Sequence, residues 1–186
     1  MKITTCYELT IRDPQGRVIK RVKRPSRSYV LAFIDLLYIQ MTQVSANIVD
    51  TGNTSRAVIA NTINFRTEAG NDVNTYGPKV GTGTGAVVIG DYALGTAIAH
   101  GTGAGTLDHQ ATEWMNLGTS GSTRSFQLRR LFVNASGAPI TINECGLYSQ
   151  GAGPYNFLTV RDLVSPGVAV PNGGSATLIY TLGVTV

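Results

Sequence analysis

Charged residues are scarce in this chain of 186 residues: they make up 14% of it, against roughly a quarter in an average soluble protein. The surface must therefore be covered by Thr, Ser, Asn and Gly, or by other subunits. Such a surface favours a part of an assembly over a solitary enzyme. Hydrophobic residues are not scarce, at 42%, so a single domain of this length can bury a core without disulfides.

Cysteines and targeting signals are few as well. Cys6 and Cys145 are the only cysteines, and their spacing matches no metal or redox motif. We expect two buried thiols, with a single disulfide as the alternative. The N-terminus lacks the layout of a signal peptide, and the longest apolar run, residues 29–39, is interrupted by Asp35 and too short to span a membrane. We expect a protein that is made in the cytoplasm and has no membrane contact.

Signatures of catalysis are missing from the sequence. The chain has two histidines, no Gly-x-Ser-x-Gly motif, and acidic residues that are scattered singly. Residues 81–86 (Gly-Thr-Gly-Thr-Gly-Ala) fit the dinucleotide pattern, but β-type residues 87–89 follow where that pattern needs a helix. We interpret the run as a glycine loop and expect no catalytic residues, no cofactor and no metal.

One cluster contains side chains of the metal-binding type: His100, Asp108, His109 and Glu113. His109 and Glu113 would share a face if residues 106–115 were helical. A zinc site needs three or four convergent ligands, and the neighbouring glycines indicate a loop. We therefore expect hydrogen bonding at a surface or interface.

The same region supports an alternative function. The Gly/Thr-rich loops of residues 77–121 could recognise host-surface carbohydrate, with Trp114 stacking on a sugar ring. The residues assigned to this ligand loop are His100, His109 and Trp114. One tryptophan beside glycine loops is more often a packing anchor, so this reading ranks second.

Basic residues are concentrated near the N-terminus. Seven of the 15 lysines and arginines fall between residues 12 and 27. Residues 3–12 and 17–23 read as strands joined by the turn sequence of residues 13–16 (Asp-Pro-Gln-Gly). We expect this hairpin to dock on an acidic patch of a neighbouring subunit, and contact with nucleic acid phosphates is the less favoured alternative. The residues assigned to the interface are Arg17, Lys20, Arg21, Lys23, Arg24 and Arg27.

A helix is predicted after the hairpin. Residues 25–28 (Pro-Ser-Arg-Ser) end the strand and offer a helix N-cap, and apolar residues then recur at helical spacing on one face. Because the opposite side is apolar too, the helix must be buried in its own domain or between subunits. We assign its Phe33 and Leu37 to a subunit interface.

Short strands separated by Gly/Pro turns fill the C-terminal part. The candidates are residues 125–134, 139–149, 155–163 and 176–186. This spacing predicts an all-β sandwich, jelly-roll-like, with an N-terminal hairpin and one buried helix. The expected organisation is an assembly arm over residues 1–45 and a β-sandwich over residues 46–186.

Three motifs in this part carry a resemblance: Asn-x-Ser-Gly at residues 134–137, Glu-x-Gly-Leu-Tyr at residues 144–148, and Val-Pro-x-Gly at residues 170–173. In this order they resemble a module of structural proteins of tailed bacteriophages and related archaeal viruses. Residues 80–83, 89–94 and 26–30 resemble the same proteins.

The resemblance implies a non-enzymatic part of a virus particle, located in the virion after assembly in the host cytoplasm. It would be a capsid decoration or cement protein, or a neck or tail protein. Its partners would be further copies of itself, in a trimer or ring, and other virion proteins such as major capsid or tail proteins. Within the module Glu144 needs a partner, for which Arg161 and Arg130 are the candidates.

Overall fold

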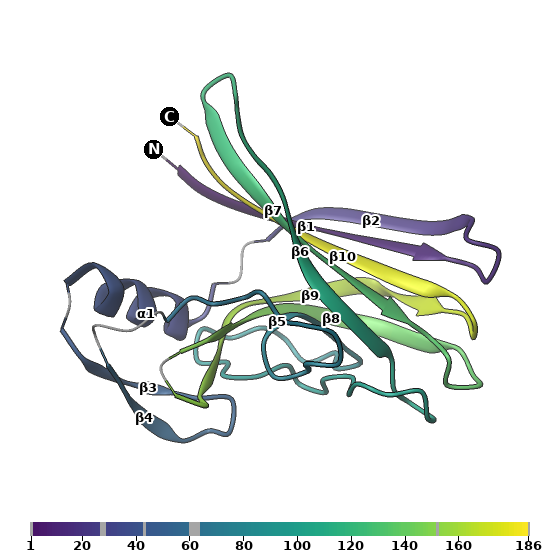
Figure 1. Ribbon diagram of the computed structural model, residues 1–186, viewed down its shortest axis with the longest axis horizontal. Coiled ribbons are helices and arrows are strands. Elements are labelled where there is room, and N and C mark those ends of the chain that lie inside the picture. Colours follow the sequence, from purple (N-terminus) through teal and green to yellow (C-terminus); the bar gives the residue numbers. More distant parts are fainter. Residues whose placement is uncertain (1, 27–28, 43, 60–63, 152, 186) are drawn as a thin grey trace.

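The computed structural model describes residues 2–26, 29–42, 44–59, 64–151 and 153–185 (Figure 1). Among them are ten strands and one helix. The elements are β1 (Lys2–Arg12), β2 (Val18–Ser26), α1 (Leu31–Thr42), β3 (Ala46–Val49), β4 (Ser55–Val58), β5 (Gly77–Gly81), β6 (Asp108–Ser120), β7 (Thr123–Val133), β8 (Ile140–Gln150), β9 (Asn156–Val170) and β10 (Ser175–Thr185).

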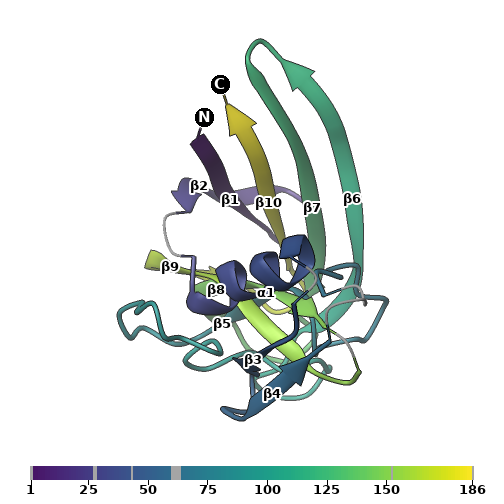
Figure 2. The same cartoon turned by 90° about the vertical axis from the view of Figure 1, so that its left-hand side faces the viewer.

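Two antiparallel sheets form the sandwich. The larger has five strands in the order β2-β1-β10-β7-β6, and the smaller has three in the order β5-β8-β9. The chain changes sheet between β7 and β8 and returns between β9 and β10. The pair β3-β4 forms a separate hairpin beside α1 (Figures 1 and 2). The expected all-β sandwich with an N-terminal hairpin and one helix is confirmed.

The turn between β1 and β2 is formed as its sequence predicts. The Asp13 carboxylate accepts hydrogen bonds from the backbone N–H groups of Gln15 and Arg17, and Gly16 takes the left-handed conformation with φ of 81°. β1 pairs with β10 along its length, from Lys2 opposite Thr185 onward. Strands from both sides of the expected boundary at residue 45 therefore belong to the same sheet.

The core lies between the two sheets. Inward-facing residues alternate along each strand, as in Leu9 and Ile11 of β1 and Leu178 and Tyr180 of β10. Each such side chain contributes about 1.5–3 kcal/mol by leaving water. Phe132 of β7 completes the layer and is fully buried.

The helix α1 is buried on one face. Ala32, Leu36 and Ile39 recur at a spacing of three to four residues and pack in a second cluster with Ile48 of β3 and Phe157 of β9. The opposite stripe remains about half exposed and consists of Leu31, Ile34 and Tyr38.

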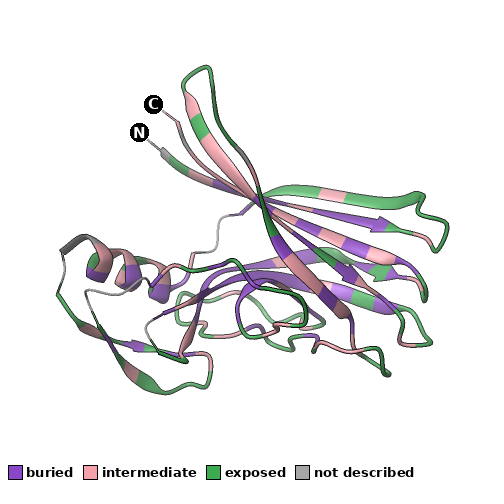
Figure 3. Cartoon of the chain, viewed as in Figure 1, coloured by how far each residue is buried: buried purple, intermediate pink, exposed green. Residues whose placement is uncertain are grey.

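The five-stranded sheet is longer than the sheet beneath it. Its far end comprises residues 3–5 of β1, 114–120 of β6, 123–127 of β7 and 181–185 of β10, and we call it the overhang. It rises at an angle from the sandwich, with both chain ends beside the β6–β7 hairpin (Figures 1 and 2). Most buried residues of these strands lie where the strands cross the smaller sheet (Figure 3).

Candidate interaction site

An apolar cleft lies on the inner face of the overhang, between it and α1. Trp114 and Leu117 remain 50% and 69% exposed there. With Met115 and Phe126 they line a hollow of about 440 Å³. A second hollow of about 190 Å³ continues toward the helix, where Phe33 forms part of its wall.

The strand register explains why the cleft is apolar. Leu182 of β10 lies opposite Phe126 of β7, and Trp114 of β6 lies opposite Leu128. Ser125 and Gln127 alternate with these residues and therefore point to the outer face. The overhang thus has the side-chain pattern of a sheet that is buried on one face, although no second layer of described residues covers its tip.

The two predicted interface residues of α1, Phe33 and Leu37, are not part of its buried stripe. The Phe33 ring stacks near Tyr29, with ring centroids 4.3 Å apart, and lies 6.1 Å from Phe65. Leu37 follows one turn later and is also partly exposed. Phe33 lines the second hollow of the apolar cleft.

The predicted basic interface residues lie along the outer edge strand β2. Arg21 pairs with Glu8, and Arg17 in the adjoining turn pairs with Asp13. Lys20, Lys23 and Arg24 are exposed and make no ion pair with another described residue, and Arg27 lies outside the described residues. Lysines and arginines along a sheet edge oppose pairing with a further strand.

The three residues of the predicted ligand loop, His100, His109 and Trp114, do not form one site in the structure. Residues 108–120 form strand β6, so the helical arrangement of His109 and Glu113 does not occur. His109 is completely buried between the rings of His100 and Phe132, with centroids 5.7 and 5.0 Å away. Trp114 lines the apolar cleft, which neither histidine lines.

His109 is held neutral by its surroundings. Burial, with the charge of Arg130 and then His100 nearby, lowers the pKa of His109 from 6.5 to about 3. Neither ring nitrogen has a hydrogen-bond partner among the described residues. The ring therefore serves as a packing element and offers no accessible ligand atom.

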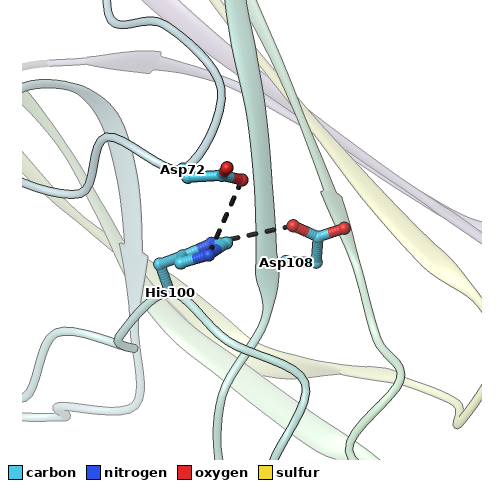
Figure 4. Close-up of side chains that lie close together, drawn as sticks. All are labelled: Asp72, His100 and Asp108. Carbon is cyan, nitrogen blue, oxygen red and sulfur yellow. Dashed lines mark ion pairs between the residues drawn. The ribbon is translucent and has the colours of Figure 1, made fainter.

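His100 belongs to a different cluster, with Asp72 and Asp108 (Figure 4). The imidazole Nε2 lies 3.6 Å from Asp72 Oδ1, and Nδ1 lies 3.6 Å from Asp108 Oδ1. Carboxylate oxygen and imidazole nitrogen are ligands that Zn²⁺ or Mn²⁺ accepts, so within the described ranges this cluster could hold a divalent cation. The His100 Nδ1 already accepts a hydrogen bond from the backbone N–H of His109 at 3.2 Å, however, so one of the two ring nitrogens is occupied by a contact within the fold.

The carboxylate of Glu144 packs against the glycine run of residues 81–85. Glu144 accepts hydrogen bonds from the backbone N–H groups of Gly83, Gly95 and Thr96, at 3.1, 3.1 and 2.8 Å. A Cβ atom on Gly81 would lie 2.6 Å from Glu144 Oε1. Within the run, the amide of Gly83 is therefore bonded to Glu144 and that of Thr82 to the carbonyl of Thr96, so neither is available to a phosphate.

The predicted partner of Glu144 is confirmed. Arg161 Nη2 lies 2.9 Å from Glu144 Oε2, and both side chains are almost completely buried. Arg161 also pairs with Asp91 at 2.8 Å, which ties the loop after β5 to strand β9. The other candidate, Arg130, does not contact Glu144 through any ion pair of the described residues.

Arg130 is instead a fully buried cation surrounded by backbone carbonyl groups. Its five N–H groups have five acceptors, the carbonyl oxygens of Gln110, Tyr76, Pro78, Gly70 and Val73. Because these residues lie in β6, β5 and the segment before β5, one side chain fixes three parts of the chain. Burial lowers the pKa of Arg130 to about 10.

The motifs that carry the resemblance also make hydrogen bonds that stabilise the fold. Asn134 donates to the carbonyls of Ala138 and Val170, and Asn172 accepts from Gly137, so the first and third motifs are bonded together. In the second motif the Tyr148 hydroxyl accepts from Leu94 N–H at 2.6 Å. These residues hold turns and loops in place.

The chain matches no protein-family model, and no curated protein or solved structure is significantly similar to it. None of the described helical segments has the length and apolarity that crossing a membrane requires.

Proposed function

We propose that this chain is a structural subunit of a tailed-virus particle, a capsid decoration or a neck or tail component, which acts through contacts with further copies and with other virion proteins. The observation that supports this proposal most is the apolar inner face of the overhang. A sheet face with this pattern, left open on one chain, is typical of a surface that assembly covers.

Two further observations support an architectural role. The apolar stripe of Leu31, Ile34 and Tyr38 gives α1 a second uncovered surface. The residues of the three motifs are engaged in holding the fold, which suits a protein whose interior provides rigidity and whose surface provides contacts.

The proposal is tested on purified particles of the virus that encodes the chain. Quantitative mass spectrometry should find the chain at a fixed, multiple copy number relative to the major capsid protein. Its absence from particles that have been purified away from host proteins would refute the proposal.

Carbohydrate recognition is a second candidate, and one observation favours it: the Trp114 indole is half exposed beside a hollow. A glycan array on the whole protein tests it. Selective binding that is lost in Trp114→Ala would support recognition of a sugar, and the absence of selective binding would exclude it.

A further inference from the structure

We infer that the inner face of the overhang packs against the same face of a second copy of this chain, related by a two-fold axis. The inference rests on the proposed function, because it names the first partner of a subunit that assembles. The two overhangs would form the sheet-on-sheet layer that each chain lacks by itself.

The missing layer is the first argument. Apolar side chains continue along the inner face past the core: Phe126 and Leu182 are partly buried against it, and Ile3 and Leu117 line a further hollow with them. Ile3 is 50% exposed although its neighbour Thr5 is buried. A partner that covers this face must be an apolar surface of similar extent, and the same face of another copy is one.

The charge distribution is the second argument. A two-fold contact brings each residue close to its own counterpart, so like charges repel unless the surface is neutral at its centre. The described side chains at the centre of the inner face are uncharged, and Arg124 lies at the rim near the hairpin tip. Strand β2, whose Lys20 and Lys23 are exposed, could not meet its own copy in this way.

The edges of the five-stranded sheet are less suited to self-association than its face. One edge is β2, which its basic residues and Pro25 protect. At the other edge, the first half of β6 is covered: Thr112 N–H donates to Ala69 O, and Asp72 N–H donates to His109 O. The second half contains a β-bulge between Met115 and Gly118, which disturbs further pairing.

The size of the overhang sets the strength of the contact. Four strands about 4.8 Å apart and about five residues long give a footprint of roughly 20 by 17 Å. A stable interface usually takes about 800 Å² from each partner, more than this footprint provides. The pair should therefore be reversible, with a Kd of about 1 μM or weaker, and become permanent only within a larger assembly.

Sedimentation velocity tests the pairing on the purified full chain, from about 1 μM to about 500 μM. We expect a monomer–dimer equilibrium. Leu117→Lys should weaken it at least about tenfold, because the dimer would then have to bury a charge in its apolar interface. Ile89→Lys is the matched control, since Ile89 is 68% exposed in a different loop, and it should leave the equilibrium unchanged.

A cysteine substitution identifies the partner surface. In a Cys6→Ser background, Leu117→Cys should form a disulfide-linked dimer on addition of diamide, which takes up the two electrons and two protons of the thiols. Ile89→Cys is the control and should cross-link much less. Wild-type protein that is monomeric at every concentration, or equal cross-linking of the two variants, would overturn the inference.

The two proposals fail separately. A monomeric chain that is nevertheless present in purified particles would leave the proposed function intact and give the overhang to a different virion protein. A dimer formed by a chain that is absent from particles would leave the two-fold contact intact and refute the proposed function.

Discussion

Replacing Arg130 by Met should destabilise the protein by about 4 kcal/mol. Five hydrogen bonds from a charged donor contribute about 1.5 kcal/mol each at the low end of their range, or about 7 kcal/mol together. Against this stands the burial of the guanidinium, whose pKa is lowered from 12.5 to about 10, a penalty of about 3 kcal/mol for the charged form. The difference is the expected loss.

Urea denaturation followed by fluorescence measures this loss. Arg129→Met is the matched control, because Arg129 is the preceding residue of the same strand and pairs with Glu113 at the surface. An exposed pair of this kind contributes at most about 1 kcal/mol. Arg130→Lys should lie between wild type and Arg130→Met, since it keeps the charge but has fewer N–H donors. Equal losses for Arg130→Met and Arg129→Met would refute the role of Arg130 as the link between three segments.

Three further predictions concern buried groups. Glu144→Gln should cost about 2–4 kcal/mol in thermal or chemical unfolding, because Arg161 loses a buried counter-charge; a loss no larger than that of Glu113→Gln would contradict this. Gly83→Ala should destabilise by at least about 1 kcal/mol, since the new Cβ would overlap the Glu144 carboxylate, and unchanged stability would show that the loop can shift. His109 has a folded-state pKa of about 3, below its unfolded value of 6.5. Its contribution to the free energy of unfolding should therefore be fully present above pH 6.5 and fall by up to about 1.4 kcal/mol per pH unit toward pH 3. In unfolding curves measured at several pH values, His109→Phe should reduce this slope by about one proton, and an unchanged slope would refute the prediction.

The C-terminal strands could be predicted because their alternation is regular and glycine turns separate them. β7, β8 and β10 begin and end within two residues of the expected ranges. β9 continues to Val170, beyond the expected residue 163, because Val164 and Val168 still point into the core. The ion pair of Glu144 with Arg161 was predictable for the same reason, since neighbouring antiparallel strands bring their side chains together.

β6 could not be recognised in the same way. Two register shifts, between His109 and Thr112 and between Met115 and Gly118, interrupt the period of two that identifies a strand. The sequence therefore suggested a loop, or a helix that would align His109 with Glu113. Because β6 is not recognisable as a strand, the overhang and its cleft cannot be predicted from the sequence, although the sequence does indicate Trp114 as a candidate ligand-binding residue.

The sequence does not reveal Asp72 as a member of the His100 cluster, because its position depends on the tertiary fold. It lies 28 residues before His100 and takes a left-handed conformation with φ of 64° in a turn that is bonded to His109. Asp accepts this conformation more readily than most residues, but sequence spacing alone does not reveal it. A composition signal would have been too weak, because single aspartates are scattered through the chain.

The two surfaces that could join copies of this chain differ in how they respond to salt. A contact of the basic strand β2 with an acidic patch is electrostatic, so raising the ionic strength from about 0.05 M to about 0.5 M should weaken it strongly. A contact between two neutral overhang faces depends on the burial of apolar surface, which salt does not weaken and sulfate strengthens. Light scattering at the two ionic strengths therefore shows which kind of surface joins the copies. An oligomer that dissociates at high salt would assign assembly to β2, whereas one that persists would assign it to an apolar surface, and its sensitivity to Leu117→Lys then distinguishes the overhang from the exposed stripe of α1.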